Sequence, residues 1–213
     1  MKKLRIKVCG MKDTGNIAEV VSLQPDYMGF ILYPGSPRYV SLETAGRLVK
    51  IIPPSIQRVG VIVNEPVENA LKIAQSGFFD MLQLHGNENI DYCSKLSVHI
   101  SIIKAFSVAQ TLPPDLSDYQ AFCKMFLFDT AGGKYGGNGK SFDHKILSHY
   151  SLEKEFILGG GISPAGSTQL KSIKADKLIA LDLNSRFEME PGIKDIKLLK
   201  SFIEKIRNND IRN

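Results

Sequence analysis

The stretch LRIKVCGMKDTG, residues 4–15, decides between two folds that are both built from parallel strands. Its first half, Leu4–Cys9, is an apolar, β-branched run of the kind that strands buried on both faces require. An open, doubly wound sheet would place a dinucleotide-binding G-x-G-x-x-G turn directly after this strand. The residues after Cys9 read GMKDTG and lack that pattern, so the stretch favours a closed barrel.

Seven further runs of the same kind follow, and longer stretches with helical periodicity separate them. The eight predicted strands are Leu4–Cys9, Tyr27–Leu32, Gln57–Val63, Met81–Leu84, Ile100–Phe106, Met125–Asp129, Glu155–Leu158 and Lys177–Asp182. Strict alternation of strands and helices indicates an α/β protein with a parallel sheet and right-handed crossovers. Eight such units in 213 residues leave little room for insertions. We therefore predict one (β/α)8 TIM-barrel domain over residues 1–213.

Helix signals lie between the predicted strands. We expect Asp13 to cap one helix, Ser41 to open a second, and Pro66 to lie in the first turn of a third. Ser163–Pro164 is expected to start a helix that reaches Leu170 and Ile173. A last helix, with an apolar stripe, is expected to span 196–206. The connection from Ser107 to Lys124 gives the weakest signal. Pro113 and Pro114 interrupt it, so any helix there is expected to be short.

Composition and charge exclude several classes of protein. No stretch approaches the roughly 20 apolar residues of a membrane span. The apolar segment at the basic N-terminus is interrupted by Arg5 and Lys7 and no cleavage site follows, so we expect no signal peptide and a cytoplasmic protein.

The net charge of +5 is dispersed and no nucleic-acid motif is present, which favours small anionic metabolites over nucleic acids as partners. The three cysteines and four histidines lack metal-ligand spacing, so we expect reduced thiols and no metal. Monomer and homodimer are both left open.

In a (β/α)8 barrel the catalytic groups lie at the carboxyl ends of the strands and in the loops that follow them. The residues at those positions are Cys9–Gly10, Pro37–Arg38, Asn64, Gln83–His85, Asp129, Gly159–Gly161 and Asp182–Ser185. Polar and reactive side chains are concentrated among them. This concentration indicates an enzyme.

The loops after the seventh and eighth predicted strands have the composition of a phosphate site. LGGGISP at 158–164 contains Gly160 and Gly161, whose backbone N–H groups can approach an anion without obstruction by a Cβ atom. Asn184 and Ser185 follow the eighth strand and can complete the cradle from a short helix. A glycine run can also form a plain turn, but its position in this fold favours phosphate.

A thiol and a carboxyl stand at two other strand ends. Cys9 ends the first strand; a free cysteine is ordinarily a small buried hydrophobe, but a thiol with a depressed pKa can act as a base. Asp129 ends the sixth strand, where partial desolvation would raise its pKa and make it a proton donor. The glycine-rich loop 131–142 that follows is either a mobile lid or a flexible surface loop. Arg38, after the second strand, can hold a carboxylate bidentately.

These segments together resemble the phosphoribosylanthranilate isomerase family. The resemblance rests, in order, on KVCGMK at 7–12, SPRYV at 36–40, GVIVN at 60–64, QLHG at 83–86, FDT at 128–130, GGNGKSF at 136–142, LGGGISP at 158–164 and PGIKD at 191–195. It implies an Amadori rearrangement of N-(5-phosphoribosyl)anthranilate in tryptophan biosynthesis, with no metal or redox cofactor. The expected partner is therefore a small phosphoribosyl substrate.

The resemblance also implies roles for individual residues. Asp129 would protonate the furanose ring oxygen as the general acid, and Cys9 would remove the proton from the sugar C2 as the general base. Arg38 would contact the anthranilate carboxylate. Gly160, Gly161, Asn184 and Ser185 would surround the phosphate, and His85 and Asp182 would line the mouth.

The chain departs from the family pattern at a few positions. The segment 182–186 reads DLNSR where DVSSG is usual, the loop after the sixth strand reads GGNG rather than GGTG, and His144 replaces an aromatic residue.

Other functions stay open as alternatives to this family. An indole-glycerol-phosphate synthase would need an early catalytic lysine and a longer N-terminus, and a pentose-phosphate epimerase would need paired aspartates and metal-binding histidines. A non-catalytic phosphometabolite-binding protein is the alternative from another class.

Overall fold

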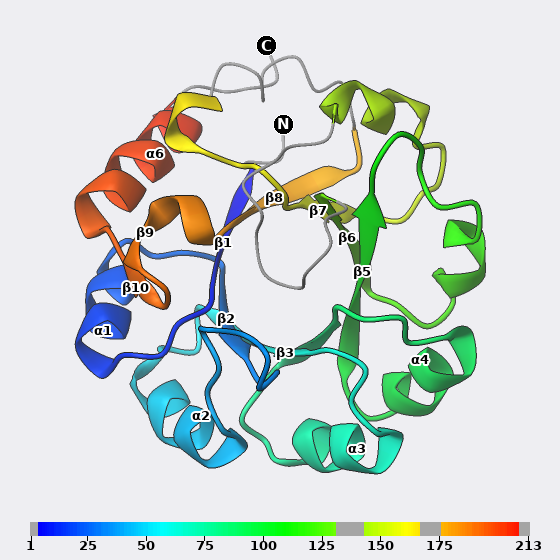
Figure 1. Ribbon diagram of the computed structural model, residues 1–213, viewed down its shortest axis with the longest axis horizontal. Coiled ribbons are helices and arrows are strands. Elements are labelled where there is room, and N and C mark those ends of the chain that lie inside the picture. The colour runs from blue at the N-terminus through cyan, green and yellow to red at the C-terminus, as the bar shows by residue number, and fades with distance from the viewer. Residues whose placement is uncertain (1–3, 131–142, 167–175, 209–213) are drawn as a thin grey trace.

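The computed structural model describes residues 4–130, 143–166 and 176–208. Its strands β1 to β8 form a closed parallel barrel in sequence order (Figure 1). They are β1 Arg5–Cys9, β2 Tyr27–Ile31, β3 Gln57–Ile62, β4 Met81–Leu84, β5 Ser101–Val108, β6 Met125–Thr130, β7 Phe156–Leu158 and β8 Leu178–Leu183. The predicted (β/α)8 barrel is confirmed, and every strand overlaps its predicted run.

Alternation of side chains along the strands produces two apolar cores. Val59 and Val61 of β3 belong to the core inside the barrel, together with Ile103 of β5. Ile62 of β3 belongs instead to the larger core between the strands and the helices. Successive side chains of a strand point to opposite faces, and both faces are covered in this fold. This is why the strand segments are apolar almost throughout.

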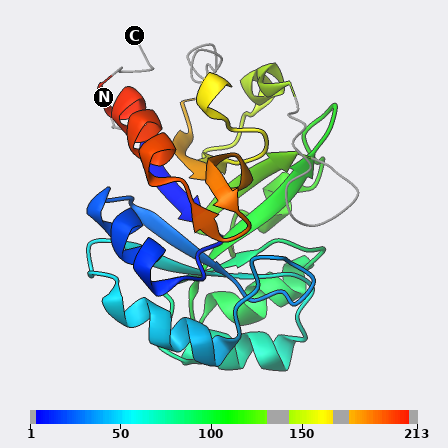
Figure 2. The same ribbon diagram turned by 60° about the vertical axis from the view of Figure 1, so that its left-hand side comes forward.

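Helices form the outer layer around the strands (Figures 1 and 2). They are α1 Thr14–Ser22, α2 Leu42–Leu48, α3 Val67–Gln75, α4 Ile90–Ser97 and α6 Ile196–Asn208. The two predicted caps are present: the carboxylate of Asp13 accepts from Asn16 N at 2.7 Å, and Ser41 Oγ accepts from Thr44 N at 3.1 Å. Pro66 is the N-cap of α3 rather than a residue of its first turn. Within the described ranges, no helix has the length and apolarity needed to cross a membrane.

The two least regular connections carry short helices. After β5, which runs to Val108, the only helix that the described residues form before β6 is the 3₁₀ helix η2, Leu116–Tyr119. After β7, the 3₁₀ helix η4, Pro164–Gly166, stands where a longer helix was predicted to begin. The predicted continuation to Leu170 and Ile173 lies outside the described residues. Further 3₁₀ helices are η1 Val49–Ile51 and η3 His144–His149.

A small hairpin after β8 was not predicted. The 3₁₀ helix η5, Ser185–Phe187, leads into the antiparallel strands β9, Glu188–Glu190, and β10, Ile193–Lys194. Asn16 of α1 holds this hairpin: its Oδ1 accepts from Lys194 N at 2.8 Å and its Nδ2 donates to Lys194 O at 3.0 Å. The hairpin therefore lies against α1 (Figure 1), and it carries charged residues to the mouth of the barrel.

Candidate active site

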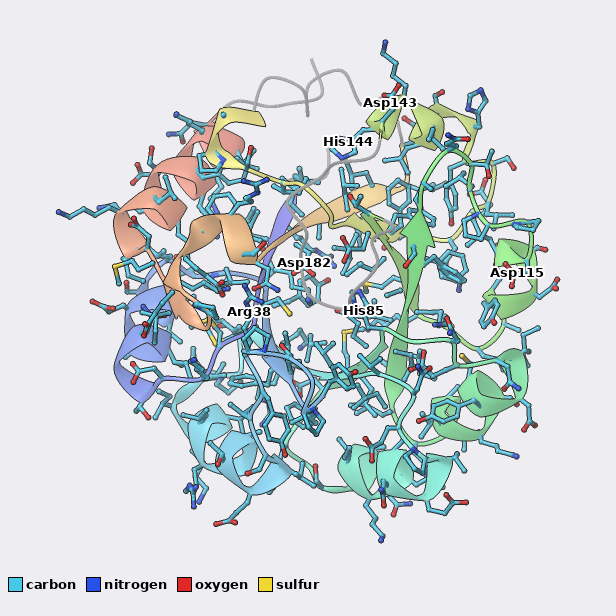
Figure 3. All side chains as sticks on the ribbon, in the orientation of Figure 1. Arg38, His85, Asp115, Asp143, His144 and Asp182 are labelled. Carbon is cyan, nitrogen blue, oxygen red and sulfur yellow. The ribbon has the colours of Figure 1, made fainter. Side chains whose placement is uncertain are left out.

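The predicted site residues meet at one mouth of the barrel. Cys9 ends β1, Asp129 is the penultimate residue of β6, and His85 follows β4. Figure 3 places Arg38, His85 and Asp182 around the barrel axis, whereas Asp115 lies at the periphery. Parallel strands in a closed barrel bring all their carboxyl ends to the same side, so residues that are far apart in sequence become neighbours there.

Cys9 is almost fully buried beside a lysine. It is 3% exposed, and Lys7, two residues earlier on the same face of β1, is buried completely. Lys7 Nζ donates to both carboxylate oxygens of Asp182 at 2.9 and 3.0 Å. Burial raises the pKa of the Cys9 thiol, and the charge of Lys7 opposes that rise without reversing it. The expected depressed pKa is therefore wrong, because desolvation inside the barrel outweighs the neighbouring cation.

Asp129 lies in more open surroundings and is bound by a histidine. Its side chain is 31% exposed, and its Oδ2 lies 3.3 Å from Nε2 of His85. Its Oδ1 accepts from the backbone N–H of Thr130 at 2.7 Å. Burial raises the pKa of this carboxyl, but the hydrogen bond and charge of His85, together with the Thr130 N–H, outweigh burial and lower it overall. The expected raised pKa is wrong, because hydrogen bonds to the charged form are the stronger influence here.

Gln83 extends this chain of polar groups into the barrel. Its Nε2 lies 2.6 Å from Nδ1 of His85. Its amide nitrogen can donate to Nδ1 of the neutral ring, and its amide oxygen, with the amide turned over, can accept from Nδ1 of the protonated ring; in both forms Nε2 donates to Asp129. Gln83 Oε1 is buried and has no hydrogen-bond partner in the part of the chain that the structure describes. The sequence marked Gln83 only as a strand-end residue, without a role.

Arg38 lies at the mouth, but a carboxylate of the protein itself binds its guanidinium. Glu188 accepts from Nε at 2.9 and 3.0 Å and from Nη2 at 2.6 Å. Lys194 Nζ donates to Glu188 Oε1 at 2.7 Å and to Asn184 Oδ1 at 2.9 Å. Burial raises the pKa of Glu188, but Arg38 and Lys194 outweigh burial and lower it. Sequence reasoning missed Glu188 and Lys194; the only signal was the PGIKD segment that contains Lys194.

The two halves of the predicted phosphate cradle are adjacent. Gly160 and Gly161 have φ angles of +66° and +75°. A Cβ on Gly160 would lie 2.4 Å from Thr130 N and 2.7 Å from Asp129 Oδ1, so only glycine fits this position. Leu158 of β7 pairs with Leu181 of β8, which brings the glycine loop next to Asn184 and to Ser185 at the start of η5. Phosphate binding by these residues stays a prediction.

The departures from the family pattern lie near the cradle or outside the described residues. The loop 131–142, interpreted as a lid, is outside them. His144 forms a hydrogen bond with the backbone of Gly160, and burial lowers the pKa of its ring. His144 therefore contacts the glycine loop of the predicted cradle.

The chemistry available at the mouth is proton transfer on an anionic substrate. The site holds a thiol, a carboxylate bonded to a histidine, and the cationic side chains of Lys7, Arg38 and Lys194. In residues 4–130, 143–166 and 176–208, no group of three or more histidine, cysteine, aspartate and glutamate side chains is arranged to hold a metal ion. A base and an acid on different strands can act on one substrate between them.

Comparisons with known proteins agree with this geometry. The sequence model of the family described as N-(5'phosphoribosyl)anthranilate (PRA) isomerase matches residues 6–205. The N-(5'-phosphoribosyl)anthranilate isomerase of Phocaeicola vulgatus is 40% identical over 206 residues, which cover 95% of this chain and 97% of that protein. The crystal structure of phosphoribosyl anthranilate isomerase from Thermotoga maritima has a TM-score of 0.85 and 35% identity, and covers 97% of this chain and 100% of that one.

A second solved structure contains a ligand. It is phosphoribosyl anthranilate isomerase in complex with reduced 1-(o-carboxyphenylamino)-1-deoxyribulose 5-phosphate, with a TM-score of 0.79 and 31% identity, covering 97% of this chain and 100% of that one. The likeness in sequence and in structure extends over nearly the whole chain. This protein therefore belongs to the N-(5'-phosphoribosyl)anthranilate isomerase family.

Proposed function

We propose that this protein converts N-(5-phosphoribosyl)anthranilate to 1-(2-carboxyphenylamino)-1-deoxyribulose 5-phosphate, the third step from chorismate to tryptophan, and that residues 1–213 act as one catalytic domain. The observation that carries the proposal is the placement of Cys9 at the end of β1 and Asp129 near the end of β6. One mouth of the barrel thus presents a base and an acid. Family membership supplies the substrate class.

Asp129 acts first, as the general acid. Its proton passes to the furanose ring oxygen, the C1–O bond breaks, and the nitrogen lone pair forms the C1=N bond of a Schiff base. Asp129 is ionised in the substrate-free protein because of its lowered pKa, so it must receive a proton before it can donate one. His85, 3.3 Å away, is placed to pass that proton to it from the doubly protonated ring, which is left as a neutral imidazole.

Cys9 acts second, as the general base. Cys9 is a thiol in the substrate-free protein, so the reactive form is the one in which the sulfur has lost its proton and Asp129 carries one. The thiolate removes the proton from C2 of the opened sugar, the C2–H electron pair forms the C1=C2 bond, and the C=N pair moves to the nitrogen to give an enolamine. The enolamine then gains a proton at C1 and loses the proton of the C2 hydroxyl, which leaves the ketone. Lys7 and Lys194 stabilise the thiolate when it forms, since both charges favour the ionised sulfur.

The remaining predicted site residues hold the substrate. The loop of Gly160 and Gly161, with Asn184 and Ser185, receives the phosphate through backbone N–H groups. Arg38 receives the carboxylate of the aromatic amine. His85 and Asp182 act on the substrate through their partners, Asp129 and Lys7 respectively.

The test is the loss of anthranilate-adduct fluorescence when the protein is added to freshly made phosphoribosylanthranilate. Cys9→Ala and Asp129→Ala should each lower kcat/KM by roughly 100- to 10,000-fold, the usual contribution of a general base or acid. Cys93→Ala, in the outer core, and Asp115→Ala, exposed at the periphery, are the matched controls and should retain nearly all activity. A wild-type protein that is inert while a known isomerase is active in the same assay would refute the proposed function.

A further inference from the structure

Three charged side chains are buried together at the mouth, and the proton-transfer steps do not use them directly. The side chains of Arg38, Glu188 and Lys194 are 6%, 4% and 0% exposed. Arg38 follows β2, whereas Glu188 and Lys194 come from the hairpin β9–β10 about 150 positions later. Buried charges are costly unless they are paired and hydrogen-bonded. A cluster of two cations and one carboxylate therefore calls for an explanation.

The geometry of the guanidinium leaves one edge available. The carboxylate of Glu188 accepts hydrogen bonds from Nε of Arg38 and from one N–H of Nη2. Among the described residues, Nη1 of Arg38 has no hydrogen-bond partner. A guanidinium has five N–H donors in a fixed fork, so the edge formed by Nη1 and the second N–H of Nη2 is left for another planar acceptor. A carboxylate fits that edge bidentately.

The charge balance points to the same class of ligand. Arg38 and Glu188 alone would form a neutral pair with little attraction for an anion. Burial lowers the pKa of Lys194, and the charge and hydrogen bond of Glu188 oppose that lowering. With Lys194 protonated, 2.7 Å from the same carboxylate, the cluster keeps one net positive charge. The backbone of Lys194 is fixed at both its N–H and its carbonyl by Asn16, and Gly192 N donates to Glu188 at 3.1 Å. The hairpin thus presents Glu188 and Lys194 in a defined position.

The space around Arg38 is also closely fitted. Gly10 has a φ of +82°, and a Cβ there would lie 2.6 Å from Cδ of Arg38 and 2.9 Å from Oδ1 of Asn184. The Asn184 oxygen accepts from Lys194. The lysine therefore bonds the partner of Arg38 and the side chain of Asn184, whereas the predicted phosphate contact of Asn184 is made by its backbone N–H.

We infer that Glu188 and Lys194 are positioning residues that make the protein specific for an aromatic amine bearing a carboxylate. Glu188 orients the guanidinium of Arg38, and Lys194 compensates Glu188 so that Arg38 retains its attraction for the ligand's carboxylate. This inference rests on the proposed function for its choice of ligand, and neither residue exchanges a proton with the substrate.

Two stable ligands test the inference without turnover. They are reduced 1-(2-carboxyphenylamino)-1-deoxyribulose 5-phosphate and the corresponding phenylamino compound without the carboxylate, with affinities measured by titration calorimetry. The wild type should bind the carboxylate ligand at least about tenfold more tightly, as a charge-assisted bidentate contact provides. Lys194→Met should weaken the carboxylate ligand by about tenfold and leave the other ligand within about threefold.

A double variant and a second ion pair provide the controls. Glu188→Gln with Lys194→Met removes both charges, leaves no unpaired buried ion, and keeps an amide oxygen for Arg38 Nε. Its ratio of the two affinities should return to within about threefold of the wild-type ratio. Lys104→Met breaks another buried pair, Lys104–Glu88 at 3.0 Å, and should weaken both ligands alike.

The outcomes separate the inference from the proposed function. If Lys194→Met weakens both ligands equally, or neither, the inference is refuted. It is also refuted if the double variant loses as much selectivity as the single one, or if the wild type does not distinguish the ligands. The proposed function depends instead on the turnover of phosphoribosylanthranilate by the wild type, so either conclusion can fail while the other holds.

Discussion

The β1–β8 side of the mouth and the β4–β6 side hold their reactive groups in opposite ways. On the first side Cys9 is buried beside ion-paired side chains, and desolvation raises its pKa. On the second side Asp129 is partly exposed and bonded to His85, and its pKa is lowered. The resting site thus holds a thiol and a carboxylate, the reverse of the thiolate and carboxylic acid that the reaction needs. Burial controls the state of the base, and hydrogen bonding controls the state of the acid.

The largest expected effect comes from removing the cation on the β1–β8 side. Lys7→Met should lower kcat/KM by about 100-fold, because the thiolate of Cys9 loses its nearest positive charge. The same change leaves Asp182 without its partner, so the free energy of unfolding should fall by about 3–5 kcal/mol. The pKa of Cys9 should also rise further. Steady-state kinetics measures the loss of activity, denaturant unfolding the loss of stability, and the pH dependence of Cys9 alkylation the change in pKa.

A double variant separates the two consequences of that change. Lys7→Met with Asp182→Asn removes the unpaired carboxylate, so most of the lost stability should return while kcat/KM stays low. Lys95→Met, on the exposed face of α4, should change stability by less than about 0.5 kcal/mol. If activity returned together with stability, Lys7 would have a structural role only. The claim that its charge favours the thiolate of Cys9 would then be wrong.

A smaller effect is expected from the histidine on the other side. His85→Asn should lower kcat/KM by about tenfold. Because His85 provides the main influences that lower the pKa of Asp129, its removal leaves burial opposed only by the Thr130 N–H and the charge of Lys7, and that pKa should rise. Carbon-13 NMR titration of the Asp129 carboxyl gives the direction directly. A pKa that is as low without His85 as with it would show that the Thr130 N–H and Lys7, and not His85, keep the carboxyl ionised.

Gln83 should matter less, because it acts through the ring. Gln83→Leu removes the donor to Nδ1 of His85 at 2.6 Å but leaves Nε2 able to face Asp129. We expect kcat/KM to fall by about threefold. Gln83→Asn, which shortens the side chain but keeps the amide, is the matched variant. A loss as large as that of His85→Asn would mean that the tautomer of the ring, rather than its presence, sets the activity.

The smallest expected change is that with pH across the neutral range. The pKa of Asp129 lies below its usual 3.8 and that of Cys9 above its usual 9.0. At any pH between those two pKa values, Asp129 and Cys9 together hold one proton. The small fraction of protein molecules that carry this proton on Asp129 and not on Cys9 therefore does not change with pH in that range. After correction for the substrate phosphate, whose second pKa is about 6, kcat/KM should be flat from about pH 5 to about pH 8. A limb within that range would contradict the pairing of the two groups.

Some of the site could be predicted because it depends on local pattern. Cys9, Asp129 and Gly160 each follow or end a run of apolar residues, and a strand end in a parallel barrel has a fixed location at the mouth. The caps at Asp13 and Ser41 could be predicted because each side chain bonds to the backbone N–H only three residues later in the chain. Glu188 and Lys194 escaped prediction because they stand in a short hairpin whose alternation of charged and apolar residues looks like an exposed surface.

The sequence by itself determined the order of strands and helices, the barrel, and the strand ends at which the thiol, the carboxyl and the glycines stand. It could do so because strand and helix periods are properties of short segments. Only the tertiary structure decided the partners and therefore the charges. Lys7 meets Asp182 because β1 closes the barrel against β8 in register, and Arg38 meets Glu188 from 150 positions away. The direction of each pKa shift follows from those through-space contacts and from burial, which no local pattern contains.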